Sequence, residues 1–169
     1  MRVLKSTIAA AALLGGVVVM SAATAQAATP NCTSPQIKVS LGMSNGAAGT
    51  IYYAIVFTNT GGTCVLWGVP PVQPVTGSAH TAVGPRAANA SMGEMPARHT
   101  LRQGQSVHDG YGVTETGNYP VSMCHPKRAA GIVVSLPGFV SAHYLSLAIS
   151  VCTSRASTHT MLLSPGRGA

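Results

Sequence analysis

The sequence brings serine, histidine and aspartate together in one short stretch, as Ser106, His108 and Asp109. A serine hydrolase needs these three groups in one site, as nucleophile, base and orienting acid. The stretch has the alternation of a β-strand, in which neighbouring side chains point to opposite faces. Ser106 and His108 would then share a face while Asp109 points away, and no Gly-x-Ser-x-Gly motif is present. We expect a polar, solvent-facing strand here and rank a hydrolase third among the candidate functions.

Carboxylates, the other common catalytic groups, are scarce. The sequence contains only Glu94, Asp109 and Glu115. A glycosidase needs two facing carboxylates, and a calcium site needs several oxygen ligands, usually with carboxylates among them. No motif for either is present. We therefore assign no catalytic residue and no cofactor, and we predict that the protein is not an enzyme.

Histidine and methionine are more plentiful, and both can bind copper in an oxidising compartment. Met92, Met95 and His99 lie close together in the sequence and are the candidate metal ligands. Met123 and His125 form a second pair. The spacing is not diagnostic of a copper site, and a cupredoxin also needs a reduced cysteine. Extracytoplasmic copper binding through His and Met ligands is thus the alternative function.

Residues 1–27 have the features of a secretory signal peptide. Arg2 and Lys5 supply positive charge, an apolar run follows, and Ala25-Gln26-Ala27 offers a small-x-small cleavage pattern. The apolar run is too short to span a bilayer comfortably, and no later run reaches that length. We expect residues 28–169 to form a single exported domain that is secreted or associated with the cell wall.

The four cysteines all follow the predicted signal peptide, so we expect them to meet an oxidising compartment and to form structural disulfides. No CxxC motif is present, and the spacings do not match a set of zinc ligands. Four cysteines allow three pairings, which the residues alone leave open. The residues concerned are Cys32, Cys64, Cys124 and Cys152.

Basic residues outnumber acidic ones, with eight Lys and Arg beyond residue 27 against three acids. Only Lys127 and Arg128 are adjacent, and no basic stretch is interleaved with aromatic residues. Nucleic-acid sites usually show such a cluster, so we expect no nucleic-acid partner. Scattered positive charge suits solubility or a loose attraction to an anionic cell envelope.

Short alternating segments between Gly, Pro and Asn residues predict an all-β chain. Thr50–Thr58 is apolar on both faces, which predicts a central strand, and Ile37–Met43 alternates as a strand with one buried face. Gly84–Arg98 is expected to be a long loop. This pattern favours a two-sheet sandwich, with a small barrel as the alternative. Further strands are expected at Cys64–Trp67, Val72–Val75, His99–Gln103, Ser106–Val113, Val121–Cys124, Ile132–Leu136, Tyr144–Val151 and Thr160–Leu163.

Several motifs resemble those of a known family. Residues 47–61 are followed by the pattern Cys64-x-Leu66-x-Gly68-x-Pro70-x-Val72, and Leu101-x-x-Gly104-x-Ser106 and Leu163-Ser164-Pro165-Gly166 come later. Together with the cysteines, they resemble the actinobacterial exported domain of unknown function 4232 over most of residues 32–166. Trp67 and Val69 depart from the usual pattern.

The resemblance implies an immunoglobulin-like β-sandwich in which Cys32 is paired with Cys64 and Cys124 with Cys152. It implies no activity, because the family is named for lacking one. It therefore supports an expected fold and location, and leaves the function to be argued from individual residues.

Aromatic residues give the remaining candidate for a binding surface. Trp67, the only tryptophan, is expected to pack against a disulfide in the core. The functional alternative is that Trp67, Tyr52 and Tyr111 line a surface patch, since aromatic residues dominate binding hot spots. Tyr111 and Tyr119 also flank a segment rich in Gly and Thr that could be a recognition loop. We carry Trp67, Tyr111 and Tyr119 forward as the candidate surface.

The sequence as a whole thus predicts a non-catalytic secreted or cell-envelope β-sandwich. We expect it to act as a binding or interaction module for an unidentified protein or an envelope glycan.

Overall fold

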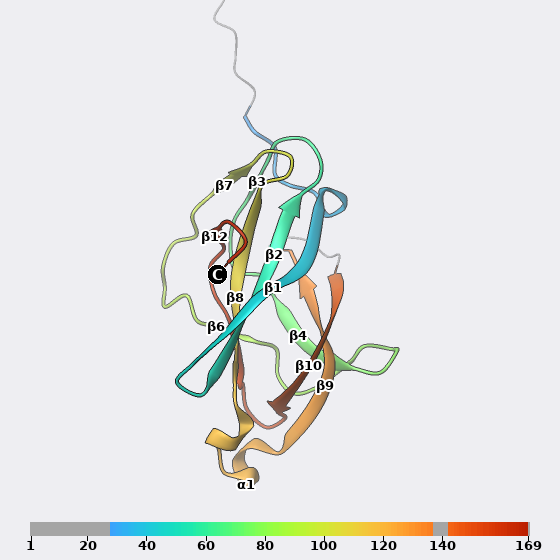
Figure 1. Ribbon diagram of the computed structural model, residues 1–169, viewed down its shortest axis with the longest axis vertical. Coiled ribbons are helices and arrows are strands. Elements are labelled where there is room, and N and C mark those ends of the chain that lie inside the picture. The colour runs from blue at the N-terminus through green and yellow to red at the C-terminus, as the bar shows by residue number, and fades with distance from the viewer. Residues whose placement is uncertain (1–27, 137–141, 169) are drawn as a thin grey trace, which may run out of the picture.

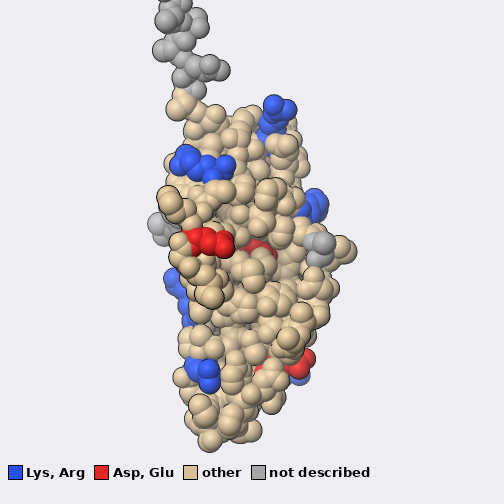
Figure 2. All heavy atoms as spheres, turned by 90° about the vertical axis from the view of Figure 1, so that its left-hand side faces the viewer, with Lys and Arg blue, Asp and Glu red and all other residues tan. Residues whose placement is uncertain are grey.

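The computed structural model describes residues 28–136 and 142–168, and these residues form an elongated, mostly β molecule (Figure 1, Figure 2). The larger sheet has the order β1-β2-β8-β11-β6, and β12 pairs with β8 on the same edge as β11. The predicted signal peptide lies outside the described residues. The strands of this sheet are β1 (Ile37–Ala47), β2 (Thr50–Asn59), β6 (Ala88–Asn89), β8 (Ser106–Thr114), β11 (Thr158–Thr160) and β12 (Ser164–Pro165).

A second sheet has the order β10-β9-β4-β5, and β3 and β7 form a separate pair. These strands are β3 (Cys64–Leu66), β4 (Val72–Thr76), β5 (Thr81–Ala82), β7 (His99–Leu101), β9 (Pro126–Ser135) and β10 (Ala142–Cys152). The helical turns are η1 (Ser34–Gln36), η2 (Thr116–Asn118) and α1 (Val121–Cys124). No helix among the described residues is long and apolar enough to cross a membrane. The prediction of a mostly β chain with two disulfides is confirmed.

The two larger sheets share one hydrophobic core. Ile55 and Phe57 of β2 are fully buried in it, together with Ile132 and Val134 of β9. Burying a side chain of this size stabilises the folded state by roughly 1.5–3 kcal/mol. This shared core holds the sheets together and so fixes the loops at their ends.

The opposite face of β2 is also covered, as its apolar character predicts. Val56 and Ala54 are buried, although they point away from the shared core. The C-terminal segment crosses them so closely that a Cβ atom on Gly168 would lie 2.7 Å from the Cβ of Ala54. β2 also pairs with β1 on one side and β8 on the other, so the prediction of a central strand is confirmed.

One prediction about β1 is wrong. Met43 was expected on the buried face, but its side chain is 63% exposed. The register with β2 shifts between Leu41 and Ser44, because β1 contains one extra residue there. A β-bulge of this kind disrupts the alternation, so Met43 no longer follows the face of Leu41.

Two further segments differ from the prediction. Val121–Cys124 is a helical turn and not a strand, and His125 ends it in the left-handed conformation. The final strand was expected at Thr160–Leu163, but β11 ends at Thr160. Beyond that point the Leu163 N–H donates to the carbonyl of Gly68, and the Leu163 side chain enters the core. The expected long loop, Gly84–Arg98, holds regular structure only at the two residues of β6.

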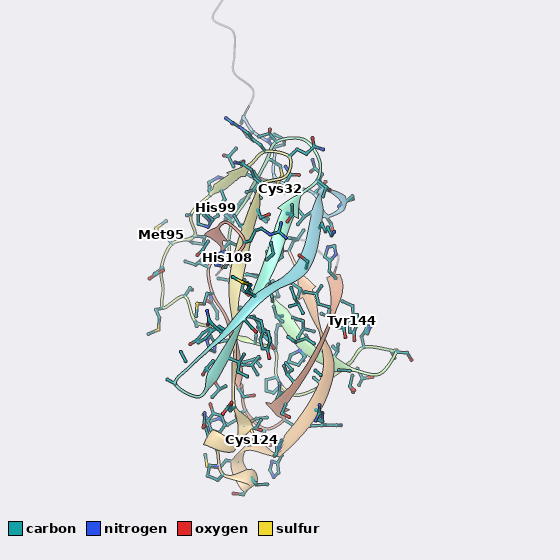
Figure 3. All side chains as sticks on the ribbon, in the orientation of Figure 1. Cys32, Met95, His99, His108, Cys124 and Tyr144 are labelled. Atoms are coloured by element: carbon teal, nitrogen blue, oxygen red, sulfur yellow. A yellow bond between two sulfur atoms is a disulfide. The ribbon has the colours of Figure 1, made fainter. Side chains whose placement is uncertain are left out.

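Two disulfides lie at opposite ends of the molecule, where Figure 3 labels Cys32 and Cys124. Cys32 is bonded to Cys64, and Cys124 to Cys152, which is the pairing that the resemblance implies. The partners are 32 and 28 residues apart in the sequence. The first bridge links the segment before η1 to the start of β3, and the second links the end of α1 to the end of β10.

We expect peptide mapping without reduction to recover these two linked pairs. Replacing Cys124 and Cys152 together by alanine should lower the free energy of unfolding by roughly 3 kcal/mol, because the bridge restricts the unfolded chain. Urea unfolding of this variant, beside the matched Cys32 and Cys64 double variant, measures the loss. A peptide linking Cys32 to Cys124 would contradict the pairing.

Candidate functional site

The candidate site is a hollow of about 470 Å³ beside β7 and the first half of β8, lined by residues 98–101, 105–107 and 165–166. We call it the Arg98 hollow. It contains two residues that the sequence singled out, His99 and Ser106. Arg98, the cation at its edge, is exposed. The hollow therefore joins segments that are far apart in the chain.

Asn59, at the end of β2, holds two walls of this hollow together. Its buried side-chain NH₂ donates to the carbonyls of Leu101 at 2.8 Å and Gly62 at 2.9 Å, and its Oδ1 accepts from the Gly61 N–H. Its backbone N–H donates to the carbonyl of Gln105 at 2.9 Å. β7 is thus tied to the turn that leads into β8. The Asn59 side chain thus stabilises the turn after β2 and also crosslinks that turn to β7.

The C-terminal segment forms the third wall. Pro165 pairs with Val107, and the Gly166 N–H donates to the carbonyl of Ser106 at 2.9 Å. His99 fixes the same segment, because its Nε2 lies 2.8 Å from the carbonyl oxygen of Leu163. The carbonyl can only accept, so Nε2 is the protonated nitrogen of this ring.

Arg98 is oriented by an aromatic ring. Its guanidinium carbon lies 4.1 Å from the centre of the Trp67 ring, and its Nη2 is 3.5 Å from Oδ1 of Asn31. A cation over an aromatic face is held by roughly 0.5–1 kcal/mol at an exposed site. Trp67 is half-buried and lies outside the core cluster, so its expected packing in the core is wrong. Its ring supports Arg98 instead.

The electrostatics of the Arg98 hollow favour a negatively charged ligand. Its lining includes one permanent cation, and no carboxylate is among the lining residues. Thr100, Gln105 and Ser106 add hydroxyl and amide groups that can donate hydrogen bonds. A guanidinium binds carboxylate or phosphate oxygens through paired N–H groups. This arrangement can bind an anion that also carries polar groups.

The predicted metal ligands are not brought together. Met92 and Met95 are 94% and 90% exposed on the loop before β7. The Nε2 atom of His99 is already engaged with a backbone carbonyl. Met123 is also exposed, and Nδ1 of His125 bonds to the hydroxyl of Ser154. Within the described residues, no group of three or more His, Cys, Asp or Glu side chains could hold a metal ion.

The predicted faces of Ser106, His108 and Asp109 agree with the burial pattern of β8, but the expectation that all three face solvent is wrong. Ser106 Oγ bonds to Thr58 Oγ1 at 2.8 Å. Asp109 is fully buried, and its Oδ1 accepts the Met161 N–H at 2.7 Å. It lies two residues from both Val107 and Tyr111 and therefore shares their inward face. These three side chains do not form a triad.

Burial raises the pKa of Asp109 to about 7, and the hydrogen bond from Met161 only partly opposes this shift. The other oxygen, Oδ2, has no hydrogen-bond partner among the described residues. An unpaired charge would be costly in such a place, so the carboxyl group favours its neutral form below about pH 7.

The predicted aromatic surface of Trp67, Tyr111 and Tyr119 is not formed. Tyr111 is 0% exposed, because it lies on the inward face of β8 with Val107 and Val113. Tyr119 is half-buried, with the guanidinium carbon of Arg155 4.3 Å from its ring centre. It follows η2, close in sequence to α1, whereas Trp67 follows β3 at the other end of the molecule (Figure 1). The three aromatic residues do not form one surface.

Arg98 and Asn59 are the important residues that sequence reasoning missed. A signal for Arg98 existed in the pairing of β3 with β7, where Cys64 is opposite Leu101 and Leu66 is opposite His99. One further step of this register puts Trp67 opposite Arg98. The sequence did not reveal that register, because neither strand shows which partner it has.

Three comparisons with known proteins complete the description of the chain. The model of a family described as a domain of unknown function (DUF4232) matches residues 32–163. No curated protein matches, and no solved structure matches.

The Asn59 crosslink leads to a first prediction for this site. Asn59→Ala should lower the free energy of unfolding by about 1–3 kcal/mol, because it leaves the carbonyl of Leu101 buried without its donor. The control is Asn118→Ala, which removes an exposed bond to the carbonyl of Gly49. Urea unfolding should separate the two variants, and equal losses would show that Asn59 has no special role.

A second prediction concerns Asp109 and pH. Between about pH 4 and pH 7 the unfolded chain releases this proton while the folded protein keeps it. The free energy of unfolding should therefore fall as pH rises through this window, by at most about 1.4 kcal/mol per pH unit. Asp109→Asn removes the titration and keeps an oxygen for the Met161 N–H. Urea unfolding across this pH window should show that the stability of the variant, relative to the wild type, increases as pH rises.

The control for this titration is Glu94→Gln, which changes an exposed acid. Its stability should follow the wild type in parallel at every pH. If the stability of Asp109→Asn also changes with pH in parallel with that of the wild type, the carboxyl group of Asp109 does not titrate near pH 7.

Proposed function

Because this chain belongs to the DUF4232 family, whose description gives no activity, we propose its function from the Arg98 hollow itself. We infer a non-catalytic protein, secreted or held in the cell envelope, that acts as a binding module. Its ligand in this proposal is an anionic envelope glycan. The scaffold that we propose for it is an immunoglobulin-like sandwich of two sheets.

One observation carries this proposal: Arg98 is held over Trp67 at a polar hollow whose lining contains no carboxylate. A cation held in place loses less conformational freedom when it binds than a freely moving one. The neighbouring hydroxyl and amide groups suit a ligand rich in oxygen atoms. A glycan that carries acidic groups combines both requirements.

The charge of the whole surface supports the same ligand. Of the three acids, Asp109 is buried, so only Glu94 and Glu115 oppose the cations at the surface. Figure 2 shows Lys and Arg side chains spaced over one face and not gathered in a band. Positive charge spread in this way attracts a long anionic polymer, and the attraction weakens as salt is added. The Arg98 hollow would supply the specific contact.

Location and scaffold have separate support. Two disulfides persist in an oxidising compartment, which favours an extracytoplasmic protein. The common core of the two larger sheets is what a sandwich requires. β8 and β9 each supply three buried residues of that core, and β2 supplies two.

The proposal is tested by measuring the binding of the disulfide-bonded protein to three polymers: polygalacturonate, a poly(glycerol phosphate) chain and neutral dextran. We expect binding to one or both acidic polymers and none to dextran. Arg98→Gln should weaken it about tenfold, the loss expected for a hydrogen-bonded charge. The matched control is Arg86→Gln, which removes an exposed cation outside the hollow. Equal losses in the two variants would contradict a specific role for the Arg98 hollow.

A further inference from the structure

A second hollow, of about 370 Å³, opens where β10 approaches β2 and β8. Its floor is apolar and extends the shared core toward solvent, with Ile51, Val113 and Ile149 lining it beside the ring of Tyr53. Glu115 and Ser150 also line it and add polar groups. We call it the Glu115 hollow.

The hollow is built by backbone features that do not depend on a ligand. The register of β10 shifts between Ser146 and Ile149, which places a β-bulge beside the lining residue Ala148. The Glu115 N–H donates to the carbonyl of Gly49 at 2.9 Å, and the side chain of Asn118 donates to the same oxygen at 3.0 Å. The segment that carries Glu115 is therefore fastened to the turn between β1 and β2.

The carboxylate of Glu115 is exposed and is not neutralised by the protein. No described cation pairs with it, although basic residues are much more common than acids in this chain. Arg155, a cation of the same end of the molecule, stacks on the ring of Tyr119 instead. A carboxylate without a partner, beside an apolar floor, is complementary to a ligand with an apolar body and one positive charge.

We propose that the Glu115 hollow binds a small amphiphilic cation, in which one ammonium group is joined to an apolar body. The body would cover Ile51, Val113 and Ile149, and the ammonium would meet Glu115. The volume lies within the usual range for small-molecule pockets, roughly 300–1,000 Å³. The ligand class follows from the combination of apolar floor and free carboxylate.

This site is separate from the Arg98 hollow. η2, which follows Glu115, lies at the opposite end of the molecule from β3 and β7 (Figure 1). The lining residues of the two hollows do not overlap, and their charged groups have opposite sign. An anionic glycan therefore cannot be the ligand of both.

The test uses 4-phenylbutylammonium as the probe, followed by ¹H–¹⁵N NMR of the disulfide-bonded protein. We expect saturable shifts at the backbone of Val113 and Ile149. The neutral 4-phenylbutanol and the anionic 4-phenylbutyrate should bind at least fivefold more weakly, because they have the same apolar body without the positive charge.

Two variants then test whether Glu115 contacts the ammonium group. Glu115→Gln should weaken the ammonium probe at least fivefold, whereas Glu94→Gln makes the same charge change on another exposed acid and should have no effect. Equal weakening by both variants, equal binding of the alcohol, or no saturable shifts would overturn the proposal. Glu115→Gln should leave binding of acidic polymers undiminished, so this result is independent of that for Arg98.

Discussion

The hydrogen bonds of the buried Asn59 amide fix the end of the molecule that carries β7 and the Arg98 hollow. A buried amide must satisfy its donors and acceptor within the protein, because water cannot replace them. Asn59 meets this requirement only if the end of β2, the following turn and β7 occupy one fixed arrangement. β7 begins next to Arg98, so this network fixes the backbone from which Arg98 extends, while the Trp67 ring holds its guanidinium. The candidate site thus inherits its geometry from an interaction that contacts no ligand.

The C-terminal segment is the second element on which the architecture depends. It follows the free edge of β8, pairing first through β11 and later through β12. Between these strands it turns Leu163 into the core and offers the Met161 N–H to Asp109. This segment, for which the sequence predicted only a strand at Thr160–Leu163, therefore pairs with a sheet edge, fills the core and forms a wall of the Arg98 hollow.

The sequence allowed the strand content, the central place of β2 and the structural use of all four cysteines to be predicted, because alternation and composition carry that information. It did not reveal the bulge near Met43, since one extra residue leaves the apolar pattern unchanged. The turn at Val121–Cys124 is too short to show a helical period. Asp109 and Tyr111 occupy the same every-second positions of β8 as Val107 and Val113, so an inward position was readable for both, but their polar groups suggested the surface. The Trp67–Arg98 contact required a strand register that no local pattern supplies.

The path of the C-terminal segment also sets an order of events in folding. A chain is synthesised from its N-terminus, and segments can pack only after they have emerged. Leu163 and Gly166 follow β9 and β10 in the chain, yet they complete the core and a wall of the Arg98 hollow. The chain must therefore be available as far as Gly166 before β8 acquires its final neighbours. A chain that stopped before Leu163 would lack this wall, and with it the shape of the hollow.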